Sequence, residues 1–172
     1  MSSLTGLSQL NLDENSIIDL SPLSPLINLN QLSLYRNQIT DISPLASLIN
    51  LTDLSLESNR IVDVAPLSAL INLADLSLHD NRITDISPLS ALVNLTALRL
   101  GTNQIKEISA LAHLTQLRMV DLTGNRITDI SPLVENTGLG EGDHVHLPGN
   151  PLSADAVDKN VQQLTSRGVT VW

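Results

Sequence analysis

The residues best suited to bind a metal lie near the C-terminal end of the chain. His144 and His146 are two positions apart, so on a strand their side chains share one face. Asp121 occupies the position that matches His146 in the preceding repeat. Two His and one carboxylate form a recognised ligand set for transition metals. Arg99 flanks Asp121 on its other side, and a charge ladder of Arg99, Asp121 and His146 explains the same residues without a metal. The ladder is the favoured interpretation, and the metal site is the weaker candidate.

A second group of residues has the chemistry of a protein-binding surface. Tyr and Arg are frequent binding hot spots, and carboxylates beside them favour a partner that carries Lys or Arg. The alternative is that these side chains are merely solvated. We predict a surface for a protein or peptide, with a basic partner favoured, formed by Tyr35, Arg36, Asp53, Glu57, Asp75, His79, Asp80 and Arg99.

A third group consists of carboxylates that recur every 22 residues. A calcium ladder is one interpretation, because calcium prefers several oxygen ligands. Local capping, in which each carboxylate accepts backbone N–H bonds of its own turn, explains the spacing more simply. The group comprises Asp19, Asp41, Asp63, Asp85, Glu107 and Asp129.

Composition and motifs exclude several function classes. The chain has no Cys, and its Ser residues have no His positioned as a base. The glycines within 138–142 precede a predicted strand and lack the Lys-Ser/Thr ending of a phosphate loop. A net charge of −9 argues against nucleic acid and anionic membranes as partners. We expect a non-catalytic protein without a cofactor, which neither binds nucleic acid nor inserts into a membrane.

The candidate residues are positioned by a 22-residue repeat, L-x-x-L-x-L-x-x-N-x-I-x-D-I-S-P-L-x-x-L-x-N. A fixed period of this length predicts a solenoid, in which each unit buries its apolar face only against its neighbours. Aromatic residues make up only 1% of the chain, so Leu and Ile must fill the interior. Full units begin at Leu7, Leu29, Leu51, Leu73, Leu95 and Leu117.

Each unit predicts a strand followed by a short helical turn. The alternation in its first part places Leu54 and Leu56 inward and Asp53 outward. The Asn that follows predicts a buried ladder, since its amide can bond the turn and the neighbouring layer. In the second part, Ser predicts an N-cap and Pro the first position of a short 3₁₀ or α segment. We predict a curved right-handed α/β solenoid with a concave parallel sheet, convex 3₁₀ or α turns and a C-terminal helical cap.

These motifs resemble the leucine-rich repeats of proteins that use them as interaction scaffolds. The 22-residue form with D-I-S-P-L is similar to the internalin-like class of bacterial surface proteins and to the phosphatase-regulatory repeat proteins of eukaryotes. The resemblance covers roughly Leu4 to Leu152. It implies a curved sheet that binds proteins, usually without catalysis, in a secreted or cell-surface bacterial protein.

The two ends of the array carry different expectations. Residues 1–152 form the predicted repeat array, and 153–172 form a C-terminal cap of the same domain. In the cap we predict a helix with Ser153 as N-cap and Gly168 just after its end, followed by a strand over Val169–Val171. The apolar stripe of this helix is predicted to be Ala154, Val157, Val161 and Leu164.

At the other end the repeat pattern extends back to Ser2 and Leu4 without a cap. An open solenoid end exposes its apolar layer. It therefore predicts either an excised fragment or an end covered by a partner or a second copy, including self-association through this end. The alternative to a binding function is a structural spacer or capping fragment of a larger surface or regulatory protein, or an engineered repeat scaffold.

Overall fold

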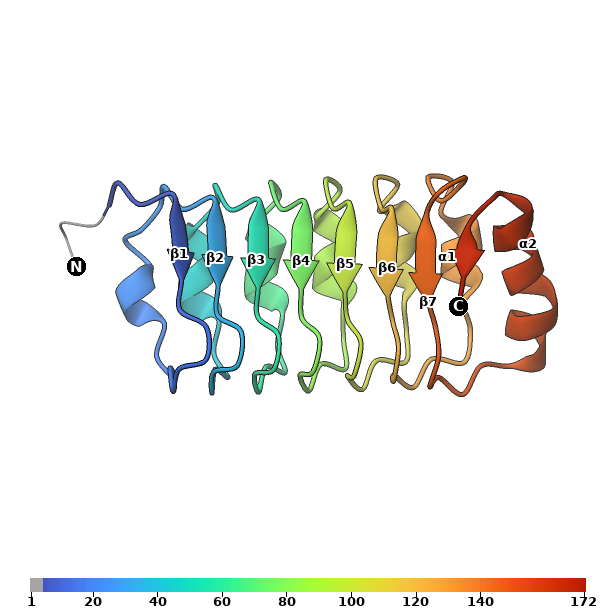
Figure 1. The fold of residues 1–172 in the computed structure, drawn as a ribbon, viewed down its shortest axis with the longest axis horizontal. Helices are drawn as coiled ribbons and strands as arrows, with labels where there is room; N and C mark the ends of the chain where they lie inside the picture. Colours follow the sequence, from blue (N-terminus) through green and yellow to red (C-terminus); the bar gives the residue numbers. More distant parts are fainter. Residues whose placement is uncertain (1–4) are drawn as a thin grey trace.

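The computed structural model describes residues 5–172 as a regular stack of strands and short helical elements (Figure 1). Within this range, eight parallel strands form one sheet, in which each strand lies beside its neighbours in sequence. Strands of adjacent full units pair at a constant offset, as in Leu54 with Leu76 and Leu76 with Leu98. The strands are β1 (Gln9–Asn11), β2 (Gln31–Ser33), β3 (Asp53–Ser55), β4 (Asp75–Ser77), β5 (Ala97–Arg99), β6 (Met119–Asp121), β7 (His144–His146) and β8 (Thr170–Val171).

The convex side carries one short helical element per unit, because only a few residues separate each turn from the next strand (Figure 1). The predicted curved solenoid with a parallel sheet and short helical turns is thus confirmed. The helical elements are the 3₁₀ helices η1 (Ser21–Leu23), η2 (Ser43–Ser47), η3 (Ala65–Ala69), η4 (Ser87–Ala91) and η5 (Ser109–His113), then α1 (Ser131–Glu135), the π-helical segment η6 (Ala156–Asn160) and α2 (Val161–Ser166).

The core consists of stacked Leu and Ile layers between the sheet and the helical elements. Leu54 and Leu56 are 2% and 0% exposed, and the matching residues of the next layers are equally buried. Asp53 and Ser55 of the same strand point to the concave face and stay partly exposed. Because each apolar layer is covered by the layers beside it, the core forms only from stacked units.

A ladder of buried Asn side chains joins the layers, as predicted. In the fourth unit, Asn81 Nδ2 donates to the carbonyl oxygens of Leu56 at 2.9 Å and Leu78 at 3.1 Å. Its Oδ1 accepts the backbone N–H of Ile61 at 3.0 Å. One amide therefore satisfies backbone groups of two layers, which their burial demands. The same pattern recurs at Asn37, Asn59, Asn103 and Asn125.

The predicted N-cap role of Ser before Pro is wrong. In the second unit the capping position is Ile42, and Ser43 is already the first helical residue. The Ser43 N–H is bonded by the carboxylate of Asp41, at 2.8 Å from Oδ1. The carboxylate two residues before Ser43 thus supplies the capping hydrogen bond that we assigned to Ser. Ala65 fits the same turn because its N–H bonds Asp63 at 2.8 Å, and no hydroxyl is needed.

The C-terminal cap forms as predicted at both ends of its helix, but its buried face differs. Ser153 Oγ accepts the N–H of Ala156 at 3.1 Å, and Gly168 adopts a φ of +88° after the last turn. The segment Ala156–Asn160 is π-helical, so its residues face different directions from those of an α-helix with the same sequence. Ala156 is therefore buried, whereas Val157 is 50% exposed. Of the predicted stripe Leu164 is buried and Val161 half-buried, while Ala154 and Val157 are exposed.

Two further observations concern the ends and the exposed surface. The predicted continuation of the repeat at Ser2 and Leu4 lies outside the described residues. Within 5–172, every helix is too short or too polar to cross a membrane.

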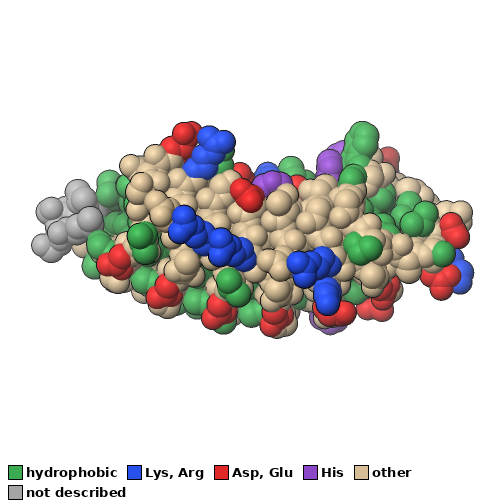
Figure 2. Space-filling model, turned by 90° about the horizontal axis from the view of Figure 1, so that it is seen from below, with side chains coloured by type: hydrophobic (Ala, Val, Ile, Leu, Met, Phe, Trp, Pro, Cys, Tyr) green, Lys and Arg blue, Asp and Glu red, His purple; other side chains and the backbone are tan. Residues whose placement is uncertain are grey.

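The edge at which the strands end carries a row of acidic side chains along one margin (Figure 2).

The turn after each strand requires a left-handed residue. Thr102 occupies this position with a φ of 55°, and Gly124 takes it one layer later. A β-branched residue in this region is strained by about 1–2 kcal/mol, whereas Asn tolerates it. We expect Thr102→Asn to raise the free energy of unfolding by about 1 kcal/mol, measured by urea denaturation. Thr84→Asn, at an exposed position outside this turn, should give no gain; equal changes in both variants would refute the strain.

Candidate functional site

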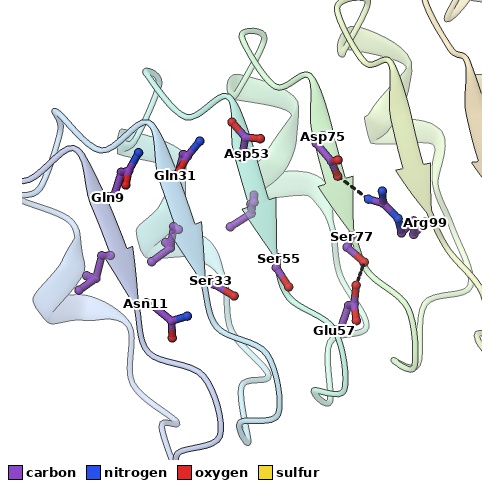
Figure 3. Close-up of a pocket in the computed structure, with 13 residues that line it drawn as sticks. Gln9, Asn11, Gln31, Ser33, Asp53, Ser55, Glu57, Asp75, Ser77 and Arg99 are labelled. Atoms are coloured by element: carbon purple, nitrogen blue, oxygen red, sulfur yellow. Dashed lines mark hydrogen bonds and ion pairs between the residues drawn. The ribbon is translucent and has the colours of Figure 1, made fainter.

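Side chains from five adjacent strands, β1 to β5, line a hollow of about 450 Å³ on the concave face (Figure 3). Leu10, Leu32 and Leu54 contribute to its lining, and the remaining lining residues are polar. Two rows run across the strands in Figure 3, one with amides and carboxylates and the other mainly with hydroxyls. The polar lining comprises Gln9, Asn11, Gln31, Ser33, Asp53, Ser55, Glu57, Asp75, Ser77 and Arg99.

One ion pair bounds the hollow on its β5 side. Arg99 of β5 reaches back to β4, where its guanidinium lies 2.5 Å from Asp75 Oδ1 (Figure 3). Both side chains are only partly exposed, at 31% and 39%. The bond fixes the orientation of Arg99 and neutralises the Asp75 carboxylate within the lining.

Two carboxylates along the strand ends are held by hydroxyls of the next layer. Glu57 Oε1 accepts the hydroxyl of Ser77, which is 4% exposed (Figure 3). Asp13 Oδ1 accepts the Ser33 hydroxyl at 2.5 Å and the Tyr35 N–H at 2.8 Å. These bonds order the two carboxylates but leave their negative charge uncompensated.

Asp53 is a carboxylate of the lining that forms no ion pair within residues 5–172. Its Oδ2 accepts the Thr52 hydroxyl at 2.7 Å, and among the described residues it has no cationic partner. The side chains of Gln9, Gln31 and Ser55 likewise bond no other described residue. The hollow therefore offers the Asp53 carboxylate, with the Ser77-bonded Glu57 carboxylate nearby, together with amide and hydroxyl groups that are free to bond a ligand.

The predicted binding residues divide into two sets. Asp53, Glu57, Asp75 and Arg99 line the hollow, whereas Tyr35, Arg36, His79 and Asp80 lie outside its lining, after strands β2 and β4. We did not predict the other polar residues of the lining, which are Gln9, Asn11, Gln31, Ser33, Ser55 and Ser77. Like Asp53, they alternate with the inward Leu residues of their strands, and this outward position is the signal that could have included them.

The rim beyond β2 is formed by an aromatic residue and an Arg. The Arg36 guanidinium lies 5.1 Å from the centroid of the Tyr35 ring, which is a cation–π distance. Arg36 also lies 3.8 Å from the carboxylate of Glu14, with both groups well exposed. Tyr35 is half-buried, so one part of its ring remains open to a partner.

Asp121 makes different contacts from those predicted. It pairs in register with His146 on the sheet, but its Oδ2 lies 3.9 Å from Nδ1 of His79. Gly101 lies between them, and a Cβ on it would lie 2.6 Å from the His79 ring nitrogen. The missing side chain of Gly101 therefore lets His79 reach across. Because Arg99 bonds Asp75 instead, the predicted ladder of Arg99, Asp121 and His146 does not form.

The weak metal candidate also fails. The His146 ring stacks on Trp172, with centroids 6.0 Å apart and an angle of 23° between the planes. Within residues 5–172, no group of three His, Cys, Asp or Glu side chains is arranged to hold a metal ion. Asp121, His144 and His146 therefore share a sheet face without converging on one point.

The five Asp residues of the recurring group act as local caps, whereas no capping bond is seen for Glu107 among the described residues. Asp85 Oδ1 accepts the Ser87 N–H at 2.8 Å, and its Oδ2 accepts the Ser87 hydroxyl at 3.0 Å. Asp129 makes the same two bonds with Ser131, both at 2.8 Å. The backbone bond and then the hydroxyl bond lower the pKa of Asp85 and of Asp129 below the ordinary value of 3.8. This geometry agrees with the capping interpretation of the row.

These lowered pKa values predict acid sensitivity. A carboxyl whose pKa is depressed by folding stabilises the fold above its ordinary pKa, and that contribution is lost as pH falls through the folded pKa. The melting temperature should therefore fall more steeply below about pH 4 in the wild type than in Asp85→Asn/Asp129→Asn. The Asn side chain retains an accepting oxygen but does not titrate. Parallel curves from pH-dependent calorimetry would contradict this prediction.

A known protein family matches the repeated part of the chain. The family described as Leucine Rich repeats (2 copies) matches four overlapping segments, 27–70, 49–91, 71–113 and 93–135. The chain belongs to the leucine-rich-repeat family. Proteins with this fold commonly serve as protein-binding scaffolds and are typically non-catalytic. No curated protein sequence matches the chain.

Solved structures extend the likeness of this leucine-rich-repeat protein to bacterial internalins. The structure of an internalin (inlF) from Listeria monocytogenes superposes with a TM-score of 0.89 at 31% sequence identity. The match covers 99% of this chain and 48% of the inlF chain. Internalin C2 of the same species shares 34% identity and a TM-score of 0.72, covering 99% and 83%. A leucine-rich-repeat protein of Leptospira interrogans has the same fold, with 22% identity, a TM-score of 0.77 and coverage of 98% and 49%. The chain thus spans about half the length of the inlF structure.

Proposed function

We propose that this protein is a non-catalytic scaffold that binds a Lys- or Arg-bearing protein or peptide on its concave face. The observation that carries the proposal is the polar hollow over β1 to β5, in which the Asp53 carboxylate has no cationic partner among the described residues. A basic side chain of the partner would compensate this charge, while Gln9, Gln31 and Ser55 would bond polar groups around it.

The charge balance of the face supports a basic partner. Asp53 and Glu57 contribute two carboxylates to the lining that have no ion pair within 5–172. Arg99, the basic residue of the lining, is already bonded to Asp75. An acidic ligand would therefore meet like charge in the hollow, whereas a basic one would be attracted.

The rim supports a protein or peptide rather than a lone cation. Tyr35 and Arg36 form a stacked pair just after strand β2, which also lines the hollow. Such residues frequently dominate protein interfaces. A partner whose basic residue enters the hollow would extend over this pair. The hollow would then provide charge recognition, and the rim would provide the apolar contact.

The test uses a phage-displayed random peptide library selected on the wild-type protein. We expect enrichment of peptides that contain Lys or Arg. In isothermal titration with one selected peptide, Asp53→Asn and Tyr35→Ala should each weaken binding about tenfold, which corresponds to roughly 1.4 kcal/mol. Both positions are partly exposed, so the variants should remain folded.

Asp158→Asn is the matched control, because it removes an exposed carboxylate from the C-terminal cap, away from the concave face. It should leave the affinity unchanged. The proposal would be wrong if selected peptides bound the wild type, Asp53→Asn and Tyr35→Ala equally well, or if the selection enriched acidic sequences.

A further inference from the structure

The edge at which the strands end, here called the strand-end edge, collects a large share of the positive charge of an acidic protein. The chain has nine Lys and Arg residues against a net charge of −9. Four of the nine lie in the turns of this edge, are exposed, and form no ion pair within residues 5–172. They are Arg60, Arg82, Lys106 and Arg126. Figure 2 shows basic side chains across the middle of this edge.

A row of acidic residues runs along the same edge, next to the convex side (Figure 2). Each unit contributes one member, as Arg60 is followed by Asp63 and Arg82 by Asp85. Between the two rows lies a strip of exposed, mostly β-branched side chains, which includes Ile18 at 61% and Val62 at 54% exposure. The edge thus carries a basic row formed by Arg60, Arg82 and Arg126, and a central strip that is uncharged except at Lys106. Beside them runs an acidic row that recurs every 22 residues.

This arrangement is self-complementary. A two-fold axis that runs along the central strip would lay the basic row of one copy on the acidic row of another, and the strips on each other. An acidic partner of another kind would also be drawn to the Arg residues, but the neighbouring carboxylate row would repel it. A second copy carries both signs of charge at the matching spacing. We propose that the strand-end edge is a self-association surface through which two copies pair side by side.

The pairing has a defined register. Arg60 and Arg82 of one copy would face Asp63 and Asp85 of the second, while Val62 of each copy meets the strip of the other. Lys106 is the charged member of the central strip, and its long side chain would turn to Glu107 of the second copy. The Ser87 backbone and hydroxyl bonds lower the pKa of Asp85, which keeps this carboxylate ionised at neutral pH. Exposed ion pairs are screened by salt, so the dimer is weak and salt-sensitive.

The experiment is sedimentation velocity over a wide range of protein concentration at low and high salt. At low salt the average mass of the wild type should rise from 18.5 kDa toward twice that value, and it should fall back at high salt. Arg60→Glu/Arg82→Glu should remain monomeric under both conditions. Asp63→Arg/Asp85→Arg should also remain monomeric, and its far-ultraviolet spectrum should show that it is folded without these two caps.

Mixing the two charge-reversed variants provides the decisive measurement. In each variant alone, positions 60, 63, 82 and 85 carry charges of one sign, so two copies repel. In a mixed pair, every one of these positions on one variant faces an opposite charge on the other. A mixture should therefore form a heterodimer at low salt. Lys159→Glu reverses an exposed charge on the cap helix and should dimerise like the wild type.

Several outcomes would overturn the proposal. A wild type that stays monomeric at all concentrations would contradict it. A dimer that persists in Arg60→Glu/Arg82→Glu would also contradict it, because the copies would then pair through another surface, such as the N-terminal end. Two monomeric, folded variants that fail to pair when mixed would exclude row-to-row contact. If poly-glutamate bound the wild type but not Arg60→Glu/Arg82→Glu while the wild type stayed monomeric, the edge would be assigned to an acidic partner instead. Tyr35→Ala separates this surface from the concave face, because it should leave the dimer intact.

Discussion

Asn81→Ala is expected to lower the free energy of unfolding by about 3–5 kcal/mol. The side chain bonds the carbonyl oxygens of Leu56 and Leu78 and accepts the N–H of Ile61. All three partners are buried, so their backbone groups would lose the amide without gaining water. The loss also spans two layers, and the stability of a solenoid depends on contacts between neighbouring units. Urea denaturation followed by circular dichroism measures the change.

Asn72→Ala is the matched control, because Asn72 occupies a second Asn position of the same repeat. Its amide donates one bond, to the Ile49 carbonyl at 2.9 Å, and its side chain is exposed. Water can replace that bond, so the expected loss is about 1 kcal/mol or less. Equal losses in the two variants would show that the buried ladder contributes no more than an ordinary surface hydrogen bond.

Gly138→Ala is expected to cost about 3 kcal/mol or more, through a steric rather than a polar effect. A Cβ at Gly138 would lie 1.9 Å from the Thr115 carbonyl oxygen and 2.5 Å from its carbon. These are backbone atoms of the preceding layer, so no side-chain rotation relieves the overlap. The loop is also fixed in place, because the Gly138 N–H bonds Asn136 Oδ1 at 2.8 Å and its carbonyl accepts from Arg118 at 3.0 Å. Thermal unfolding by calorimetry measures the loss.

Gly140→Ala, two residues later in the same loop, separates this clash from a general effect of Ala. A Cβ there meets only the Arg167 carbonyl oxygen at 3.8 Å, which is an ordinary contact. Gly140→Ala should change the melting temperature little. A small effect at both positions would mean that the loop moves away from Thr115 at low cost.

The repeat predicted the architecture well because each layer makes nearly the same contacts as the next. The inward Leu residues, the Asn ladder and the parallel register recur with the period, so one unit such as 73–94 specifies them for the whole stack. The C-terminal end of the stack, from the sixth unit into the cap, was harder to predict. Asn136, 0% exposed and bonded to the Leu111 and Leu114 carbonyls, holds the sixth unit although it matches no ladder position. The π-helical segment that exposes Val157 has no signature in the apolar pattern.

The side-chain contacts on the concave face could not be predicted from the repeat. The alternation of the strand correctly placed Asp53 outward, but the partners of the long side chains on this face were not predicted. Arg99 turned to Asp75 rather than Asp121, and His79 crossed Gly101 toward Asp121.

The stack, its register and the alternation of inward and outward residues could be predicted because a period of 22 residues repeats every backbone contact. Which charges are compensated and which, such as Asp53, stay without an ion pair became clear only from the folded arrangement. A flexible polar side chain on an open sheet can bond neighbours one or two layers away. Which neighbour it bonds depends on the particular residues of several units, which no single repeat contains.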